Sequence, residues 1–197
     1  MVPLNFSLQG YQFQSGLKVI RDSFLASSKA LGDSISSIED KIIAYEKSGV
    51  FVGELDEDGN RLWSEDQRLG LELISAKEGI MHMRKACVIV LYHHWEKAIG
   101  KLQGGGKGNH EELIEVALKN NVSVDVNGME RLRLLVNTLK HNSETQGKSL
   151  KIKWPDVFLG GSGVGSWNDW YGAVFLKDSH LEEAFSILYA SGPQTRF

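Results

Sequence analysis

The sequence has a single cysteine, Cys87, so no disulfide can form within the chain and a zinc site built on cysteine thiolates lacks its ligands. Its longest dense apolar run, residues 86–92, is far shorter than the roughly 20 residues that cross a bilayer. Residues 1–10 show no basic segment followed by an apolar run, which is the pattern of a secretory signal. We therefore expect a cytoplasmic protein with no membrane partner.

An excess of basic charge is also missing. The chain carries 22 Lys and Arg against 25 Asp and Glu, which gives a formal net charge of −3. Non-specific binding to nucleic acid depends on cations that neutralise phosphates, so the chain does not coat nucleic acid by charge alone. A local basic patch remains compatible with this balance.

The composition that is present fits a globular protein, because 42% of the 197 residues are hydrophobic and 24% are charged. This length favours one domain, 1–197, with a core at about 15–142 and a loop-rich extension at 143–197. Apolar residues at steps of three and four predict a long helix over 15–48, with one apolar stripe: Leu17, Ile20, Phe24, Leu31, Ile35, Ile38, Ile42 and Tyr45.

A second long helix is predicted over 64–100, after a polar turn at 51–61. Ser64 and Gln67 have the spacing of a capping box at its start. Two long helices that each carry one apolar face pack most simply as an antiparallel pair. The sequence therefore predicts an all-α fold, a helical bundle built on two long antiparallel helices.

Shorter helices are expected after a flexible glycine-rich loop at 103–108. Asn109 with Glu112, and Asn127 with Glu130, have cap spacing and predict helices over 109–120 and 127–142. A last helix is expected to begin at Ser179, with Glu182 as its box partner, and residues 174–176 fit a strand or a helix equally well. The tail is rich in aromatic residues and lysines, which either close over the core or stack single-stranded nucleic acid: Lys148, Lys151, Lys153, Trp154, Trp167, Trp170 and Tyr171.

Two glycine-containing segments resemble phosphate loops but lack their context. The segment 147–149 ends like a Walker A motif without its first glycine, and 161–165 has no βαβ surroundings, so both are predicted to be loops. A metal site at His82, His93, His94 and Glu96 is disfavoured, because ligand pairs on a helix usually lie three or four residues apart and no second cluster is present. We expect neither a metal nor a cofactor.

The helix over 127–142 carries the candidate chemistry. Arg133, Asn137 and His141 are four residues apart, so they lie on one polar face. A guanidinium binds phosphate and an imidazole moves protons near neutral pH, which together suffice to cleave a phosphodiester without a metal. The alternative is structural: Arg133 forms an ion pair with Glu130 or Glu96, and His141 favours the negative end of the helix.

The segment 132–142, Leu-Arg-Leu-Leu-Val-Asn-Thr-Leu-Lys-His-Asn, resembles the signature helix of the HEPN superfamily (higher-eukaryote-and-prokaryote nucleotide-binding domains). The preceding pair of long helices, which carries residues 92–96 near its end, suits that architecture. Asn137 and His141 match the polar residue and the histidine of the family motif, whereas Val136 occupies the arginine position and Arg133 lies one turn earlier.

The resemblance implies a homodimer that acts on RNA, as a metal-independent endoribonuclease of the toxin–antitoxin or antiviral type. Catalysis would fall to Arg133, Asn137 and His141, and substrate contacts to the neighbouring residues Lys140, Asn142, Glu96 and His94. The resemblance equally allows a non-catalytic helical module that dimerises or binds a cognate protein, and Val136 favours that alternative. The sequence leaves both open.

Overall fold

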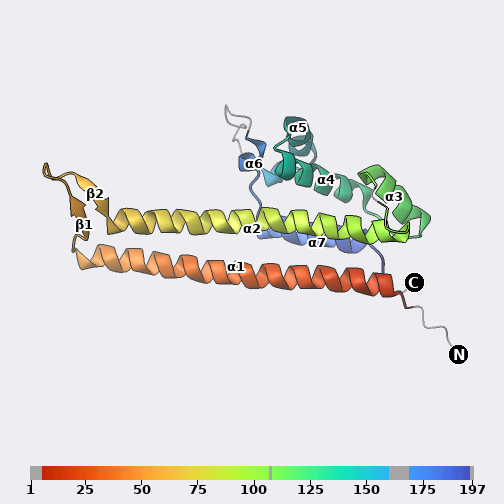
Figure 1. Ribbon diagram of the computed structural model, residues 1–197, viewed down its shortest axis with the longest axis horizontal. Coiled ribbons are helices and arrows are strands. Elements are labelled where there is room, and N and C mark those ends of the chain that lie inside the picture. Colours follow the sequence, from red (N-terminus) through yellow and green to blue (C-terminus); the bar gives the residue numbers. More distant parts are fainter. Residues whose placement is uncertain (1–5, 107, 160–168, 196–197) are drawn as a thin grey trace. The chain divides into compact units, whose positions relative to one another are not determined.

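The computed structural model describes residues 6–106, 108–159 and 169–195, and it confirms the all-α prediction (Figure 1). Two helices are long, and they pack together as expected. In chain order the elements are α1 (Leu8–Ser48), β1 (Gly53–Leu55), β2 (Arg61–Ser64), α2 (Glu65–Leu102), α3 (His110–Lys119), α4 (Val126–His141), α5 (Glu144–Lys153), the short 3-10 helix η1 (Pro155–Val157), α6 (Trp170–Ala173) and α7 (Asp178–Ala190).

The chain divides into two compact units, and the division passes through both long helices. Unit 1 comprises residues 1–23 and 84–197, and unit 2 comprises residues 24–83. Unit 2 carries twelve Asp and Glu against six Lys and Arg, whereas the rest of the chain carries thirteen against sixteen. The acidic charge of the protein is therefore concentrated in unit 2.

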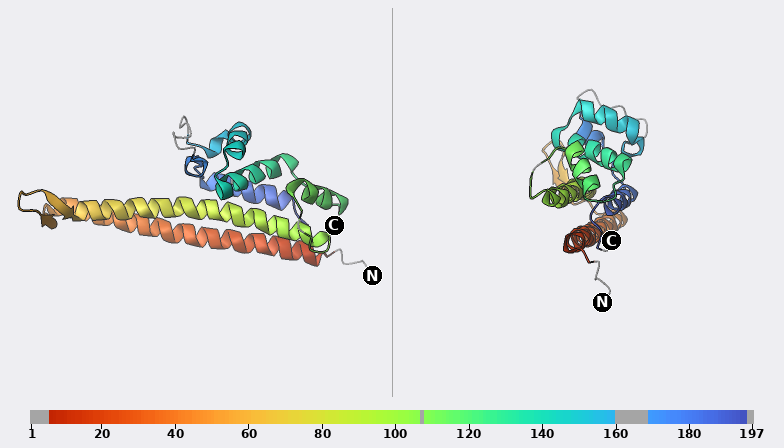
Figure 2. Two further views of the ribbon diagram at one scale, coloured as in Figure 1. Left: turned by 45° about the horizontal axis from the view of Figure 1, so that its top comes forward. Right: turned by 90° about the vertical axis from the view of Figure 1, so that its right-hand side faces the viewer.

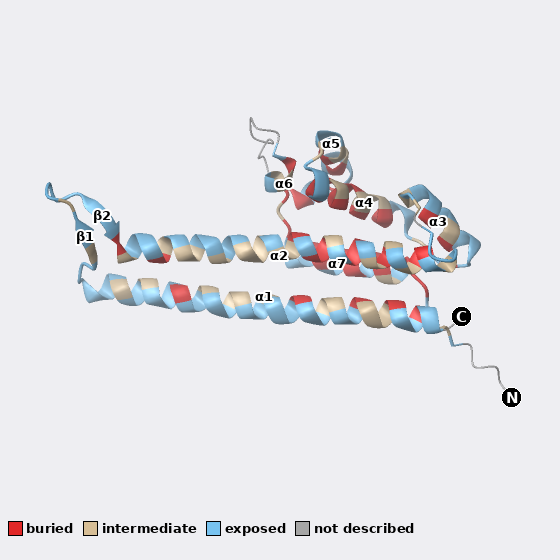
Figure 3. Ribbon diagram, in the orientation of Figure 1, coloured by how far each residue is buried: buried red, intermediate tan, exposed pale blue. Residues whose placement is uncertain are grey.

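Unit 2 is a hairpin of two helical segments joined by the two strands. Within it α1 and α2 approach each other where Gly79 faces Leu31, and the Lys77 ammonium lies 3.3 Å from a Glu39 carboxylate oxygen. Its buried apolar side chains are Phe24, Ile38 and Leu69, and most of its remaining helical surface is exposed (Figure 3). This exposure is expected, because each helix carries one apolar stripe among serines and charged residues, and a pair of helices buries only the stripes that face each other.

The connection between the long helices is more regular than the polar turn predicted at 51–61. β1 and β2 pair antiparallel, with Gly53 opposite Ser64 and Glu54 opposite Trp63. Asp56 closes the turn, because its carboxylate accepts N–H bonds from Asp58 and Asn60, and these bonds lower its pKa. Side-chain hydrogen bonds of this kind stabilise tight turns, which explains why the segment forms a β-hairpin and not an irregular loop.

Unit 1 contains the larger core. The first turns of α1 lie beside α2 and α7, and α4 lies on the other side of these two helices (Figure 2). α4 contacts α5, α6 and α7. Trp95 on α2 is fully buried, and its indole N–H donates to the Ser191 carbonyl oxygen at 2.6 Å. The apolar run at residues 86–92 supplies Val88, Leu91 and Tyr92 to this core, whereas Val90 is 50% exposed.

The prediction of a loop at 147–149 was wrong, because these residues belong to the helix α5. Ser143 caps this helix by accepting from the Gln146 N–H, and its buried residues are Gly147 and Leu150. A Cβ on Gly147 would lie 2.2 Å from the Trp170 ring, so the helix packs against α6 at a distance that only glycine permits. Tertiary packing therefore selects the helix, since α5 has no clear apolar stripe of its own.

Other helix boundaries differ from the predictions because the caps lie elsewhere. α1 begins two turns earlier, where Ser7 Oγ accepts from the Gly10 N–H, and Asp125 rather than Asn127 caps α4. The Asn109–Glu112 capping box of α3 is confirmed. α7 begins one residue before Ser179, and the Lys177 N–H donates to His180 Nδ1 in place of the predicted box with Glu182.

Two aromatic residues of the tail, Trp154 and Trp170, belong to the core, whereas Tyr171 is half-buried. Trp154 and Trp170 are both 4% exposed, as expected if they close over the bundle. Val174 pairs with Phe158 in an isolated antiparallel bridge, which settles the choice left open at 174–176 in favour of extended backbone. Trp167 and the glycine segment 161–165 lie outside the described residues. No helix in the described ranges is long and apolar enough to cross a membrane.

Candidate functional site

The candidate motif lies on α4, which is anchored by a buried apolar face. Asp125 accepts from the Gly128 N–H at the start of the helix, and Asn142 ends it in the left-handed conformation with φ of 48°. That conformation is tolerated by asparagine, which explains the stop directly after His141. Val136, at the position of the family's arginine, is 1% exposed and packs in the core. A charged side chain does not fit there without a partner.

Arg133 is engaged in a structural ion pair. Its Nε and Nη2 donate to the two carboxylate oxygens of Glu130 at 2.7 and 2.9 Å, and Nη1 lies 3.5 Å from Gln146 Oε1. Both partners are about four-fifths buried, so the pair is shielded from solvent. The hydrogen bonds from Arg133 lower the pKa of Glu130, and the same bonds raise that of Arg133. The alternative reading of Arg133 as half of an ion pair is confirmed.

The other two motif residues share the face of Arg133 but not its contacts. Asn137 is half-buried and His141 is exposed. Within the described part of the chain, no hydrogen bond joins either side chain to Arg133 or to the other. The helix thus brings the three residues onto one face without assembling them into a hydrogen-bonded group. Asn142, a predicted substrate contact, instead accepts the Tyr171 N–H at 2.8 Å and ties α4 to α6.

A groove of about 750 Å³ lies beside this face, over the last turns of α2. Its polar lining combines three lysines with a histidine and a carboxylate: His93, Glu96, Lys97, Lys101 and Lys140. Leu113 and four glycines complete the lining: Gly100 on α2, and Gly105, Gly106 and Gly108 after it. Lys140 and Glu96 were predicted substrate contacts, and the structure brings these two together. Arg133, Asn137 and His141 are not among the residues that line the groove.

The lysines of this groove differ from most cations of the protein. Most described Lys and Arg side chains pair with a carboxylate, such as Arg68 with Glu65 or Lys148 with Glu144. Lys97, Lys101 and Lys140 form no ion pair with any described carboxylate. Three unpaired ammonium groups in one concave surface attract an anion such as a phosphate. The groove also holds the pair of His93 Nδ1 and Glu96 Oε2 at 2.5 Å.

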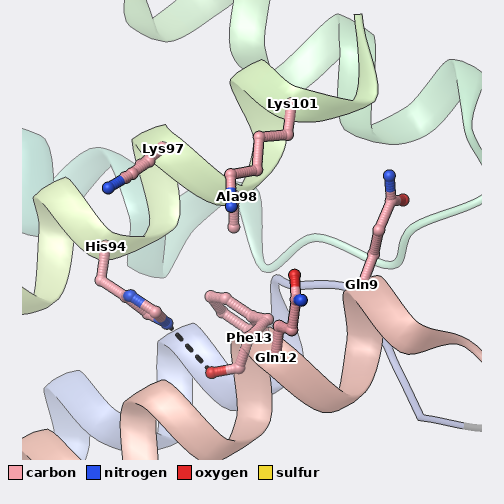
Figure 4. A pocket seen from close by; sticks show the side chains of 7 residues that line it. All are labelled: Gln9, Gln12, Phe13, His94, Lys97, Ala98 and Lys101. Atoms are coloured by element: carbon pink, nitrogen blue, oxygen red, sulfur yellow. Dashed lines mark hydrogen bonds between the residues drawn. The ribbon is translucent and has the colours of Figure 1, made fainter. Parts of the chain in front are cut away.

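His94, the remaining predicted substrate contact, lines a second pocket, which shares Lys97 and Lys101 with the groove (Figure 4). Its Nε2 lies 3.0 Å from the Phe13 carbonyl oxygen, and its ring stacks on the Phe13 ring at 5.3 Å. These contacts connect α2 to the start of α1 inside unit 1. They also explain Gly16, because a Cβ there would lie 2.2 Å from the His94 ring. His94 therefore has a packing role, and its role as a substrate contact stays a prediction.

A buried pair of titratable groups was missed in the sequence. The Tyr92 hydroxyl lies 2.8 Å from His110 Nδ1, and both rings contact Trp95. Burial raises the pKa of Tyr92 and lowers that of His110, and the nearby positive charge of Arg133 lowers the His110 pKa further. Both groups are therefore neutral near pH 7, with the hydroxyl donating to the imidazole.

This pair makes stability depend on pH. Because the folded pKa of His110 lies below its ordinary value of 6.5, the unfolded chain binds the proton more readily. Its stabilising contribution is complete above pH 6.5 and is lost as the pH falls toward the folded pKa. We expect the urea midpoint of unfolding to decrease when the pH is lowered from 7.5 to 5.5, and His110→Gln to make this decrease smaller. Burial also lowers the pKa of His180, so His180 accounts for part of the decrease that remains in the variant. An unchanged pH dependence in His110→Gln would contradict this assignment.

The described residues contain no group of three His, Cys, Asp or Glu side chains suited to a metal ion. Cys87 is buried, and burial raises its pKa to about 11, which keeps the thiol protonated and unreactive near neutral pH. Comparison with known proteins gave no match: no family model, no curated protein and no solved structure matches the chain.

Proposed function

We propose that this chain is a non-catalytic helical binding module built on a HEPN-like fold, the second of the two functions that the sequence left open. The observation that carries the proposal is the bidentate bond between Arg133 and Glu130, which neutralises the one arginine of the motif region available to act on phosphate. Val136 supplies no replacement, because it is buried at the motif position. Because Arg133 is held by Glu130, His141 lacks a free guanidinium on its own face to stabilise the charge of a cleaved phosphodiester.

A binding role also suits the way α4 is used. Its buried face joins α5, α6 and α7, so the helix organises the core of unit 1. A helix that packs the core contributes to the scaffold, and function is then expected at the exposed sites that the scaffold carries. Self-association remains part of the proposal, as expected from the family resemblance.

A second candidate function is RNA cleavage, and one observation favours it. The groove with Lys97, Lys101 and Lys140 offers three unpaired cations beside the His93–Glu96 pair. A carboxylate on Nδ1 orients an imidazole so that Nε2 can accept or donate a proton, as general acid–base catalysis requires. This arrangement would place catalysis on α2, on a different histidine from the one predicted.

One experiment separates these functions. Purified protein is incubated with a mixed RNA pool, with and without a chelator, beside His141→Ala and His93→Ala. The binding module predicts no cleavage by any of the three proteins above the level of a mock purification. Cleavage that disappears in His141→Ala would contradict the proposal in favour of the predicted nuclease, and cleavage that disappears only in His93→Ala would favour the groove.

A further inference from the structure

The end of unit 2 carries a concentration of exposed apolar side chains that the core does not use. Six large apolar residues within the stretch 50–63 are each at least 44% exposed, and together we name them the apolar tip: Val50, Phe51, Val52, Leu55, Leu62 and Trp63. Three other exposed apolar residues, Phe6, Leu8 and Tyr11, lie at the start of α1, and others, such as Leu118 on α3 and Ile152 on α5, occur singly. Contiguous exposed apolar surface of this kind marks a site of interaction.

The apolar tip is held in a fixed conformation. The Val52 N–H donates to the Tyr45 hydroxyl at 3.0 Å, and the Val52 carbonyl accepts from the Glu65 N–H at 2.9 Å. The Arg61 guanidinium lies over the Phe51 ring, 5.4 Å from its centroid. A surface that is ordered before binding loses less conformational entropy when it docks.

Charge around the apolar tip restricts what can cover it. The segment 47–66 contains six carboxylates, Glu54, Asp56, Glu57, Asp58, Glu65 and Asp66, against two cations, Lys47 and Arg61. Asp66 and Glu65 pair with arginines, whereas Glu54, Glu57 and Asp58 form no ion pair with a described cation. The border of the tip is therefore strongly acidic.

This border selects one class of partner. Two tips of the same chain would repel each other, because like charges across an interface are costly. The cytoplasmic surface of a membrane is anionic and would repel the tip as well. A protein surface with an apolar pocket bordered by lysines and arginines satisfies both the apolar residues and the carboxylates.

We infer that the apolar tip is the docking surface for such a protein, one with an apolar pocket and a basic border. The inference rests on the proposed function, since it names the surface and the partner of the binding module. Trp63 and Phe51 are the anchors, because aromatic side chains carry most of the binding energy in interfaces of this type. The carboxylates guide the approach and make the affinity depend on salt.

The test uses the full chain in the cells that produce it, with the photo-reactive residue p-benzoylphenylalanine in place of Leu62. The protein that cross-links is identified and purified, and its Kd is measured for the unmodified chain and for Trp63→Ser. We expect Trp63→Ser to weaken binding by on the order of thirtyfold, the effect of removing a central aromatic anchor. The matched control Ile152→Ser removes an apolar side chain that is 83% exposed on α5, and it leaves the Kd unchanged.

Charge provides a second readout. Replacing Glu54, Glu57 and Asp58 together with lysine is expected to weaken binding and to reduce its dependence on salt. Cross-links only to a second copy, to lipid or to nothing would overturn the inference, as would full affinity in Trp63→Ser. If the partner binds through another surface, the inference about the apolar tip is wrong, but the proposed binding module is not contradicted. RNA cleavage that requires His141 would contradict the binding module itself, independently of what the apolar tip binds.

Discussion

Trp95→Ala is expected to lower the free energy of unfolding by about 3–5 kcal/mol, the usual cost of deleting a large buried aromatic side chain. Trp95 is fully buried, and its indole donates to the Ser191 carbonyl oxygen at 2.6 Å, so the variant leaves both a cavity and an unsatisfied acceptor. The ring also packs against both Tyr92 and His110, whose centroids lie 5.8 and 6.0 Å away. Urea unfolding followed by circular dichroism measures the change.

Trp63→Ala is the matched control, because it removes the same side chain from the apolar tip. Trp63 is 44% exposed and lies in the short strand β2. Surface substitutions of this kind change the free energy of unfolding by within about 0.5 kcal/mol. Equal destabilisation by Trp95→Ala and Trp63→Ala would contradict this account in two ways. Burial would not explain the larger cost expected for Trp95→Ala, and Trp63 would belong to a core and not to an exposed apolar tip.

Gly147→Ala is expected to destabilise unit 1 by about 2–3 kcal/mol, at the upper end of the cost of overpacking. The new methyl would lie 2.2 Å from Cε3 of the Trp170 ring, and Trp170 is itself 4% exposed. Neither side can yield without moving α5 away from α4 and α6. A fall in the urea midpoint, with loss of near-ultraviolet tryptophan signal, is the expected result.

Gly32→Ala makes the same chemical change on α1, where nothing lies within 4 Å of the added methyl. Alanine in a helix interior is more stable than glycine by roughly 0.5–1 kcal/mol, so this variant should gain stability. Opposite signs for the two glycines are therefore predicted. A stabilising Gly147→Ala would show that α5 does not pack closely on Trp170.

The fold could be predicted where local pattern and burial agree. The stripe through Leu17, Phe24 and Ile38 predicted α1, because spacings of seven and fourteen positions keep these residues on one face. Asn109 predicted the start of α3, because its capping partner Glu112 lies within the same turn. α5 was missed because its evidence is not local. Only Gly147 and Leu150 are buried in it, and the fit of Gly147 to Trp170 joins positions 23 residues apart.

The candidate site divides in the same way. The bond of Arg133 to Glu130 was open to prediction because its partner lies one turn away. The groove was also within reach, since His93, Lys97 and Lys101 are four residues apart on one helix, although its third lysine comes from α4. The Tyr92–His110 pair joins two helices across a glycine-rich loop, and no spacing rule indicates such a contact.

The central claim is that the polar face of α4 is structural, with Arg133 committed to Glu130 and therefore not free to serve His141. Single-turnover incubation of a fluorescently labelled RNA pool with excess protein, without added metal, tests it most directly. The account predicts identical RNA profiles for the unmodified chain, for His141→Ala and for a sample without protein. RNA that the unmodified chain cuts and His141→Ala leaves intact would contradict it.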